Sequence, residues 1–322
     1  MAYLVRKLLH SLFLLCGVSL LIFSLLAIAP GDFFTEMELN PALSAASVEK
    51  QRVQRELDRP LPVRYFRWLK GLLRGDWGQS LAYQVPVWPL LRVRALNTLL
   101  LTIVATIVSW VLALSLGIWT AARRNHALDR CVMFGTSVFL GIPDLMIGLL
   151  LLMWAVRSRT LPAGGMASLD HESLEAAGRA ADTLRHLILP ASALVVAALP
   201  ILLRHVRASM IDALEAPSVR TARSVGVGWI RILLRHALPL ASNPLISLLG
   251  LSIAGLLSGS LLVEWIMSWP GLGPLLLEAI LARDIYVVIG AVMLSTILLV
   301  AGNLFADILL ATVDPRMREE HS

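Results

Sequence analysis

Charged side chains are scarce in this sequence: they make up 16% of its 322 residues, while 57% are hydrophobic. Because a soluble domain carries about 25% charged residues, this composition excludes an ordinary water-soluble globular protein. Lysine is the rarest charged residue: only Lys7, Lys50 and Lys70 are present. None follows a glycine, so the sequence has no G-x-x-x-x-G-K-[ST] phosphate-binding loop, and no bound cofactor is expected. Only Cys16 and Cys131 are cysteines, which excludes a disulfide framework.

The hydrophobic residues gather in six runs of about 20 residues, the length that a helix needs to cross roughly 30 Å of hydrocarbon. The runs are Leu8–Ala29, Leu96–Ala121, Cys131–Val156, Leu187–Val206, Leu238–Val263 and Tyr286–Thr312. In lipid each run must be a helix, because only a helix satisfies its backbone groups within one segment. We therefore predict an all-α membrane protein with six transmembrane helices.

The first run has two interpretations. Arg6-Lys7 before it and Ala27-Ile28-Ala29 at its end are typical of a cleaved signal peptide. However, the apolar stretch is longer than the usual signal core of 7–15 residues. We therefore expect a retained helix.

The distribution of arginine predicts the orientation. Arg6 and Lys7 place the N-terminus in the cytoplasm, and the connections that are then cytoplasmic are rich in arginine, as the positive-inside rule requires. The net charge of +6 is explained in this way, without nucleic-acid binding. We expect residues 1–29 to hold the N-terminus and first helix, residues 30–95 to form an external segment, and residues 96–312 the core. The short tail 313–322 is expected in the cytoplasm, like the N-terminus.

Asp144 is an ionisable residue inside the third run, and such residues are often functional because burying charge in lipid is costly. It either faces a translocation path and favours cationic or amine-bearing solutes, or binds a backbone group that Pro143 leaves unpaired. Pro143, Pro200 and Pro244 are expected to interrupt helices. Gly250, Gly255 and Gly259 are expected to pack closely against another helix. The histidines of three Leu-Arg-His triplets fall on both sides of the membrane and predict no metal site.

The longest cytoplasmic connection, residues 207–237, is unusually elaborate. A polar stretch with Arg220-Thr221-Ala222-Arg223 is followed by a break at Gly226, a second helical stretch and Leu238-Pro239. These residues resemble the EAA–x3–G–x9–I–x–L–P signature of permease subunits from binding-protein-dependent ABC importers. Arg220 replaces its Glu and His236 its Ile. The peptide- and nickel-importing branch is the more similar one, and further matches to it include Gly75-Asp76-Trp77-Gly78, Leu161-Pro162-Ala163-Gly164-Gly165 and Trp269-Pro270-Gly271-Leu272-Gly273.

The resemblance implies the fold of a type I ABC importer permease, of the first-permease (B-type) kind. It implies a second permease that is a different polypeptide, two ATPase subunits, an external solute-binding protein, and peptides, nickel complexes or glutathione-like compounds as solutes. Thr221, Ala222 and Gly226 would let the loop approach an ATPase subunit closely, while Arg220 and Arg223 would pair with acidic groups there. For these arginines, positive-inside topology alone is the alternative explanation.

Two other function classes remain as alternatives. An ion-coupled secondary transporter is disfavoured because the halves show no obvious repeat and midplane charges are nearly missing. A membrane-embedded enzyme is disfavoured because the candidate His, Ser and Asp residues do not fall at one depth.

Overall fold

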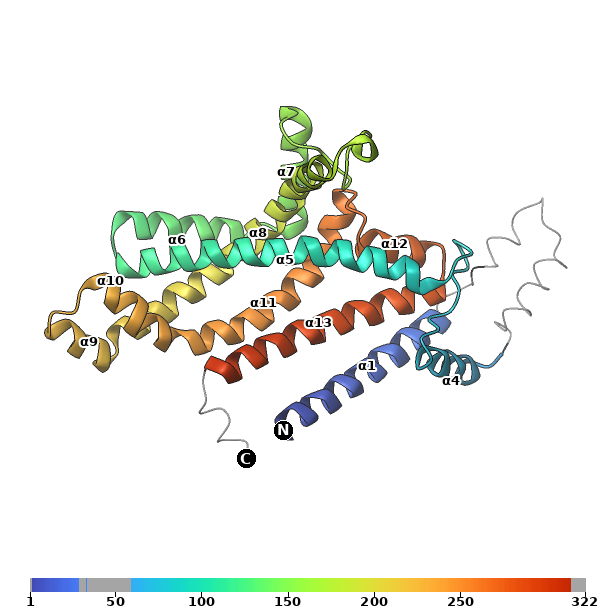
Figure 1. The fold of residues 1–322 in the computed structure, drawn as a ribbon, viewed down its shortest axis with the longest axis horizontal. Coiled ribbons are helices and arrows are strands. Elements are labelled where there is room, and N and C mark those ends of the chain that lie inside the picture. Colours follow the sequence, from blue (N-terminus) through green and yellow to red (C-terminus); the bar gives the residue numbers. More distant parts are fainter. Residues whose placement is uncertain (1, 29–32, 34–58, 314–322) are drawn as a thin grey trace. The chain divides into compact units, whose positions relative to one another are not determined.

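The computed structural model describes residues 2–28, 33 and 59–313. Residues 34–58 of the expected external segment and residues 314–322 of the expected tail lie outside these residues. The described parts are helical and contain no strand, which confirms the predicted fold class (Figure 1). The longer elements are α1 (Ala2–Ile28), α4 (Leu61–Leu72), α5 (Val87–Ala122), α6 (Ala127–Leu140), α7 (Asp144–Ser158), α8 (Ala176–Glu215), α9 (Pro217–Ser224), α11 (Leu238–Ile266), α12 (Leu272–Leu281) and α13 (Ile285–Val313). The short ones are a 3-10 turn (His171–Ser173), α10 (Trp229–Arg231) and a π-helix (Ile232–Ala237).

Within the described residues, five helical segments are long and apolar enough to span a membrane: α1, α5, α8, α13 and the continuous stretch from α10 to α11. They contain five of the six predicted runs. The remaining run, Cys131–Val156, was expected to be one helix, and this expectation is wrong. The chain breaks at Gly141-Ile142-Pro143, and α6 and α7 are bent by 100° relative to each other.

The sequence explains why the break falls there. Proline has no N–H to donate to the preceding turn, and its ring pushes the residue before it towards an extended conformation. Pro143 itself has ψ 140°, outside the helical range, and Asp144 then begins α7. Pro200 and Pro244, in contrast, lie inside the continuous helices α8 and α11. The expectation that they interrupt helices is also wrong, because both helices continue through the proline.

The described chain divides into two compact units. Residues 98–269, together with 299 onwards, form the larger unit. In it α8 is central and contacts α6, α7 and α11. Two clusters of buried side chains hold these helices together, one around Leu187, Leu194 and Trp269 and the other around Ala113, Val206 and Met210.

Glycine allows close approach at two positions of the larger unit. A Cβ on Gly117 would lie 2.6 Å from Val206 Cγ1, so α5 and α8 meet where α5 has no side chain. A Cβ on Gly250 would lie 2.9 Å from Ala306 Cβ, which confirms close packing for that glycine. Gly255 has no atom within 4 Å of where its Cβ would be, so no other described helix of this chain packs closely against it.

The smaller unit contains residues 1–97 and 270–298. Here α4 packs on α1: the hydroxyls of Tyr65 and Ser19 are 2.9 Å apart, and the ring of Phe23 lies edge-on to that of Tyr65. The carboxylate of Asp284, fully buried, accepts hydrogen bonds from the Ser80 hydroxyl at 2.6 Å and the Ala82 N–H at 3.0 Å. These bonds fix the loop between α4 and α5.

Tyr83 belongs to the same loop and donates its hydroxyl proton to the Glu278 carboxylate of α12 at 2.5 Å. Partial burial, together with this hydrogen bond, raises the pKa of Tyr83 to about 12. The hydroxyl therefore stays protonated at neutral pH and keeps its role as a donor.

Candidate functional site

The connection between α8 and α11 forms the first candidate site. Helix α8 ends at Glu215, and α9 starts at Pro217, a residue suited to a first helical turn because its missing N–H would have no helical partner there. A turn over Val225–Gly228 leads to α10 and the π-helix, which passes directly into α11 at Leu238-Pro239. The predicted order of helix, glycine turn, helix and membrane span is confirmed.

Gly226 sets the geometry of the turn. Its φ is +78°, in the left-handed region that glycine enters without a steric penalty. The Gly226 N–H donates to the Arg223 carbonyl, and the Val227 N–H donates to the Ala222 carbonyl, both at 3.1 Å. This pair of bonds is the Schellman motif, which ends a helix and satisfies its last carbonyl groups. The chain therefore reverses at a defined residue.

The two faces of α9 have different surroundings. Val219 and Ala222 are buried against the rest of the larger unit, whereas Arg220, Thr221 and Arg223 are exposed. The predicted loop residues therefore do not all lie on one exposed surface, because Ala222 is buried.

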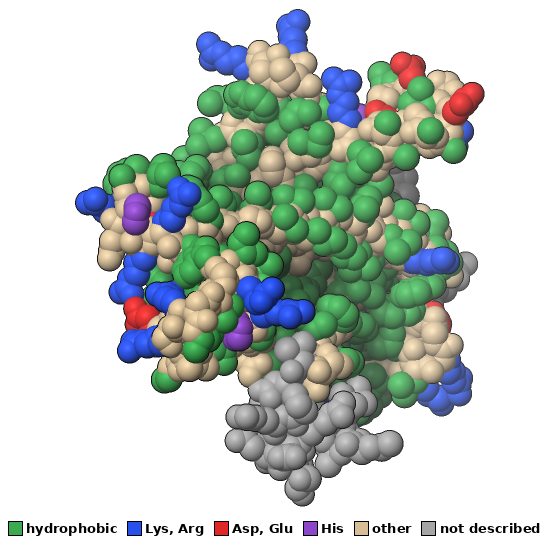
Figure 2. Space-filling view, turned by 60° about the vertical axis from the view of Figure 1, so that its left-hand side comes forward, with side chains coloured by type: hydrophobic (Ala, Val, Ile, Leu, Met, Phe, Trp, Pro, Cys, Tyr) green, Lys and Arg blue, Asp and Glu red, His purple; other side chains and the backbone are tan. Residues whose placement is uncertain are grey.

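Apolar side chains complete the exposed surface of the loop. Val225 and Ile230 are 74% and 73% exposed, and the guanidinium of Arg223 lies 5.2 Å from the centre of the Trp229 ring. Figure 2 is turned so that the end with α9 comes forward, and Lys and Arg side chains gather there. Exposed apolar residues among cations are typical of a protein-binding surface.

Asp144 forms part of the second candidate site. It is the first residue of α7 and lines a cavity of about 420 Å³ between α7, α8 and α11. His205 of α8 and Ser252 of α11 are the other polar side chains of the lining, and Gly255 and Gly259 open space on α11. Within the described residues, no hydrogen bond or ion pair involves the Asp144 carboxylate, and the residue is exposed.

A different carboxylate, that of Asp129, forms strong contacts, and it was not identified from the sequence. Asp129 of α6 is buried and forms two 2.7 Å hydrogen bonds with the guanidinium of Arg207 on α8. Arg204, one turn earlier, donates to the Thr136 hydroxyl at 3.0 Å. The sequence explained both arginines by topology alone. The single acidic residue of the segment Arg123–Arg130 was the available signal for a specific partner.

Comparisons with known proteins identify the family of this chain. Residues 113–319 match the family described as binding-protein-dependent transport system inner membrane component. The chain is 37% identical to the oligopeptide transport system permease protein AppB of Bacillus subtilis, over 98% of this chain and 99% of that one. It is 32% identical to the glutathione transport system permease protein GsiC of Salmonella paratyphi A, over 98% of each chain.

Among solved structures, an inward-facing methionine ABC transporter, MetNI, contains a chain with the same fold. The TM-score is 0.57 at 20% identity, and the match covers 70% of this chain and 96% of that one. The chain therefore belongs to the family of binding-protein-dependent transport system inner membrane components: it is a multi-pass inner-membrane permease subunit of an ATP-driven importer, a transport component and not an enzyme.

Proposed function

We propose that this permease imports peptides or related small solutes, such as glutathione-like compounds or nickel complexes. The printed names of two relatives, an oligopeptide and a glutathione permease that align over nearly the whole chain, support this range. The family implies a partner permease, ATPase subunits and a binding protein. We propose in addition that the partner permease is a different polypeptide, that two ATPase subunits bind, and that the binding protein is external.

We propose that both termini and the α8–α11 connection are cytoplasmic, with residues 30–95 outside. The arginines near the described cytoplasmic helix ends support this orientation. The ATPase would bind the exposed surface of Arg220, Thr221 and Arg223 together with the turn at Gly226, and Leu238-Pro239 would pass the movement into α11.

The observation that carries this proposal is an apolar and cationic surface on a chain without a phosphate-binding loop. ATP hydrolysis then has to come from another subunit, and this surface offers it a contact. Ile230→Glu tests the contact, because Ile230 is 73% exposed and a charge there leaves the core intact. We expect much less ATPase subunit to co-purify with the tagged chain. Leu169→Glu, at an apolar residue that is also exposed, is the matched control. Equal recovery from both variants would rule out this surface.

We propose that the Asp144 cavity is part of the translocation path and favours amine-bearing solutes. An exposed carboxylate at an otherwise mostly apolar cavity attracts a cation more strongly than it would in water. Asp144→Asn should lower transport of basic peptides relative to neutral ones, whereas the same change at Asp170, an exposed residue of an external loop, should not. An unchanged ratio in Asp144→Asn would remove the proposal.

A further inference from the structure

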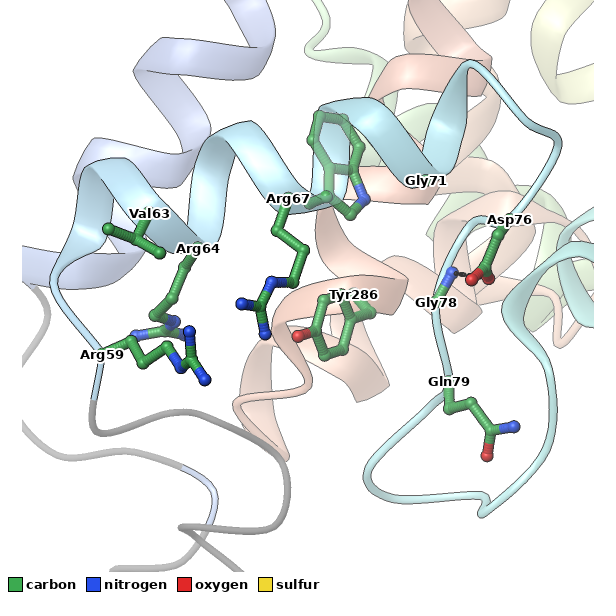
Figure 3. Close-up of a pocket in the computed structure, with 10 residues that line it drawn as sticks. Arg59, Val63, Arg64, Arg67, Gly71, Asp76, Gly78, Gln79 and Tyr286 are labelled. Carbon is green, nitrogen blue, oxygen red and sulfur yellow. Dashed lines mark hydrogen bonds between the residues drawn. The ribbon is translucent and has the colours of Figure 1, made fainter.

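A second cavity lies in the smaller unit. Its volume is about 400 Å³ (Figure 3). The lining comes from the start and one face of α4, the loop that follows it and the first turn of α13: Arg59, Val63, Arg64, Arg67, Trp68, Gly71, Asp76, Gly78, Gln79 and Tyr286. The Gly75-Asp76-Trp77-Gly78 motif thus shapes this cavity.

The charge of the lining is mainly positive. Arg59, Arg64 and Arg67 contribute three guanidinium groups, and Figure 3 shows these side chains extending to the same side of α4. Asp76 is the one carboxylate in the described lining, and its Oδ1 accepts a hydrogen bond from the Gly78 N–H at 2.9 Å. An anion is therefore the favoured ligand, and guanidinium groups bind phosphate oxygens in pairs of hydrogen bonds.

A buried donor gives independent support. Trp68 is only 5% exposed and lines the cavity, yet its Nε1–H finds no acceptor among the described residues. Buried N–H groups are rarely left without a partner, because the lost hydrogen bond with water is costly. A ligand oxygen inside the cavity would provide the missing acceptor.

Two glycines keep the cavity open. Gly78 has φ +87°, and a Cβ there would lie 2.9 Å from the Tyr286 ring. A Cβ on Gly71 would lie 3.2 Å from the Asp76 carbonyl oxygen. Larger residues at these positions would push the loop and the ring apart, so the shape depends on them.

The position of α4 indicates where the ligand comes from. Tyr65 and Trp68 of α4 contact Phe23, which lies about one and a half turns before the end of α1 at Ile28. Helix α4 therefore lies beside the half of α1 that approaches the lipid headgroups, where aromatic side chains are enriched. Phe66 and Leu73 of the same segment are 67% and 82% exposed. Arginine beside exposed apolar side chains is the pattern of a helix that lies in the membrane interface.

We propose that this cavity binds the phosphate of an anionic phospholipid headgroup, with Arg64, Arg67 and the Trp68 N–H as its ligands. The lining of this cavity shares no residue with the α8–α11 connection or with the Asp144 cavity, so this inference does not depend on the transported solute. Free phosphate has the same chemistry, and its contribution is measured separately.

The test uses the purified full transporter and native mass spectrometry. The complex is titrated with dioleoyl phosphatidylglycerol, with dioleoyl phosphatidylcholine and with inorganic phosphate. Arg64→Gln and Arg67→Gln should each weaken phosphatidylglycerol binding roughly tenfold, as expected for one charge-assisted hydrogen bond. Trp68→Phe, which keeps a ring and removes the N–H, should weaken it by about threefold. Arg74→Gln, at an exposed arginine that does not line the cavity, is the matched control and should stay within about twofold.

Four results would overturn the proposal. Equal effects of Arg64→Gln and Arg74→Gln would mean general attraction to the membrane and no site. Equal binding of phosphatidylcholine would exclude selection of an anionic headgroup. Inorganic phosphate that displaces the lipid at similar concentration would identify a soluble ligand. An unchanged affinity in Trp68→Phe, with an unchanged melting temperature, would exclude the buried donor as a ligand.

Discussion

Replacing Gly226 with alanine isolates the contribution of one backbone conformation to ATPase coupling. Gly226 has φ +78°, and a Cβ there would have no atom within 4 Å, so the substitution causes no clash. Its cost is that of placing an L-residue in the left-handed region, about 1–2 kcal/mol. The free energy that keeps α9 and α10 in their present arrangement falls by this amount. The ratio of loops with the right shape to loops without it falls by a factor of roughly 5–30.

Gly228 provides a matched control in the same turn. A Cβ there would also have no atom within 4 Å, but its φ is −60°, which any residue adopts. Gly228→Ala should therefore leave coupling unchanged, and Gly226→Asn should be milder than Gly226→Ala because asparagine tolerates the left-handed region.

The assay is ATP hydrolysis stimulated by the solute-loaded binding protein, in proteoliposomes with limiting ATPase subunit. We expect Gly226→Ala to reduce stimulation by up to about 5- to 30-fold. If Gly228→Ala is equally damaging, or if Gly226→Ala has no effect, the left-handed turn is not what the ATPase recognises.

Two further predictions concern packing in the larger unit. Asp129→Ala should lower the free energy of unfolding by about 3–5 kcal/mol, because it leaves a guanidinium without its buried partner; Glu215→Ala, in an exposed ion pair whose side chains are 49% and 58% exposed, should cost under about 1 kcal/mol. Chemical denaturation of the detergent-solubilised complex measures both, and equal costs would contradict the argument. Gly117→Ala should destabilise by about 1–3 kcal/mol through overpacking, whereas Gly135→Ala, with no atom within 4 Å of its Cβ, should be neutral or stabilising. Gly117→Ala should therefore have the lower melting temperature of the two variants, and the opposite ranking would contradict the prediction.

The sequence predicted the helical class and five of the six spans because long apolar runs have only one solution in lipid. It also predicted the turn at Gly226, since the glycine falls between two helical patterns. It predicted that Pro143, Pro200 and Pro244 all interrupt helices, and this prediction is confirmed only for Pro143. Only Pro143 follows a glycine closely and precedes a polar residue, and only there does the helix break. Whether a proline breaks a helix depends on the neighbours that pack around it, which single-sequence patterns do not contain.

Only part of the candidate site could be predicted from the sequence, because the packing of helices decides which side chains are exposed. Arg220 and Arg223 are exposed, as a contact with a partner requires, but the burial of Ala222 depends on how α9 packs on α8. The pair of Asp129 and Arg207 joins residues 78 positions apart. Nothing local in the sequence indicates such a pair, because the bend after α6 and the length of α8 together bring the two side chains into contact.

The break between α6 and α7 also bears on how the chain is made and retained in a cell. The 14 residues of α6 extend only about 21 Å and the 15 of α7 about 22 Å. Neither crosses the hydrocarbon alone, and non-helical backbone at that depth needs protein or water around it. Gly141 and Pro143 are exposed in the single chain. A newly inserted copy therefore leaves this backbone exposed until another subunit covers it. We expect its lifetime in the cell to depend on the supply of that subunit.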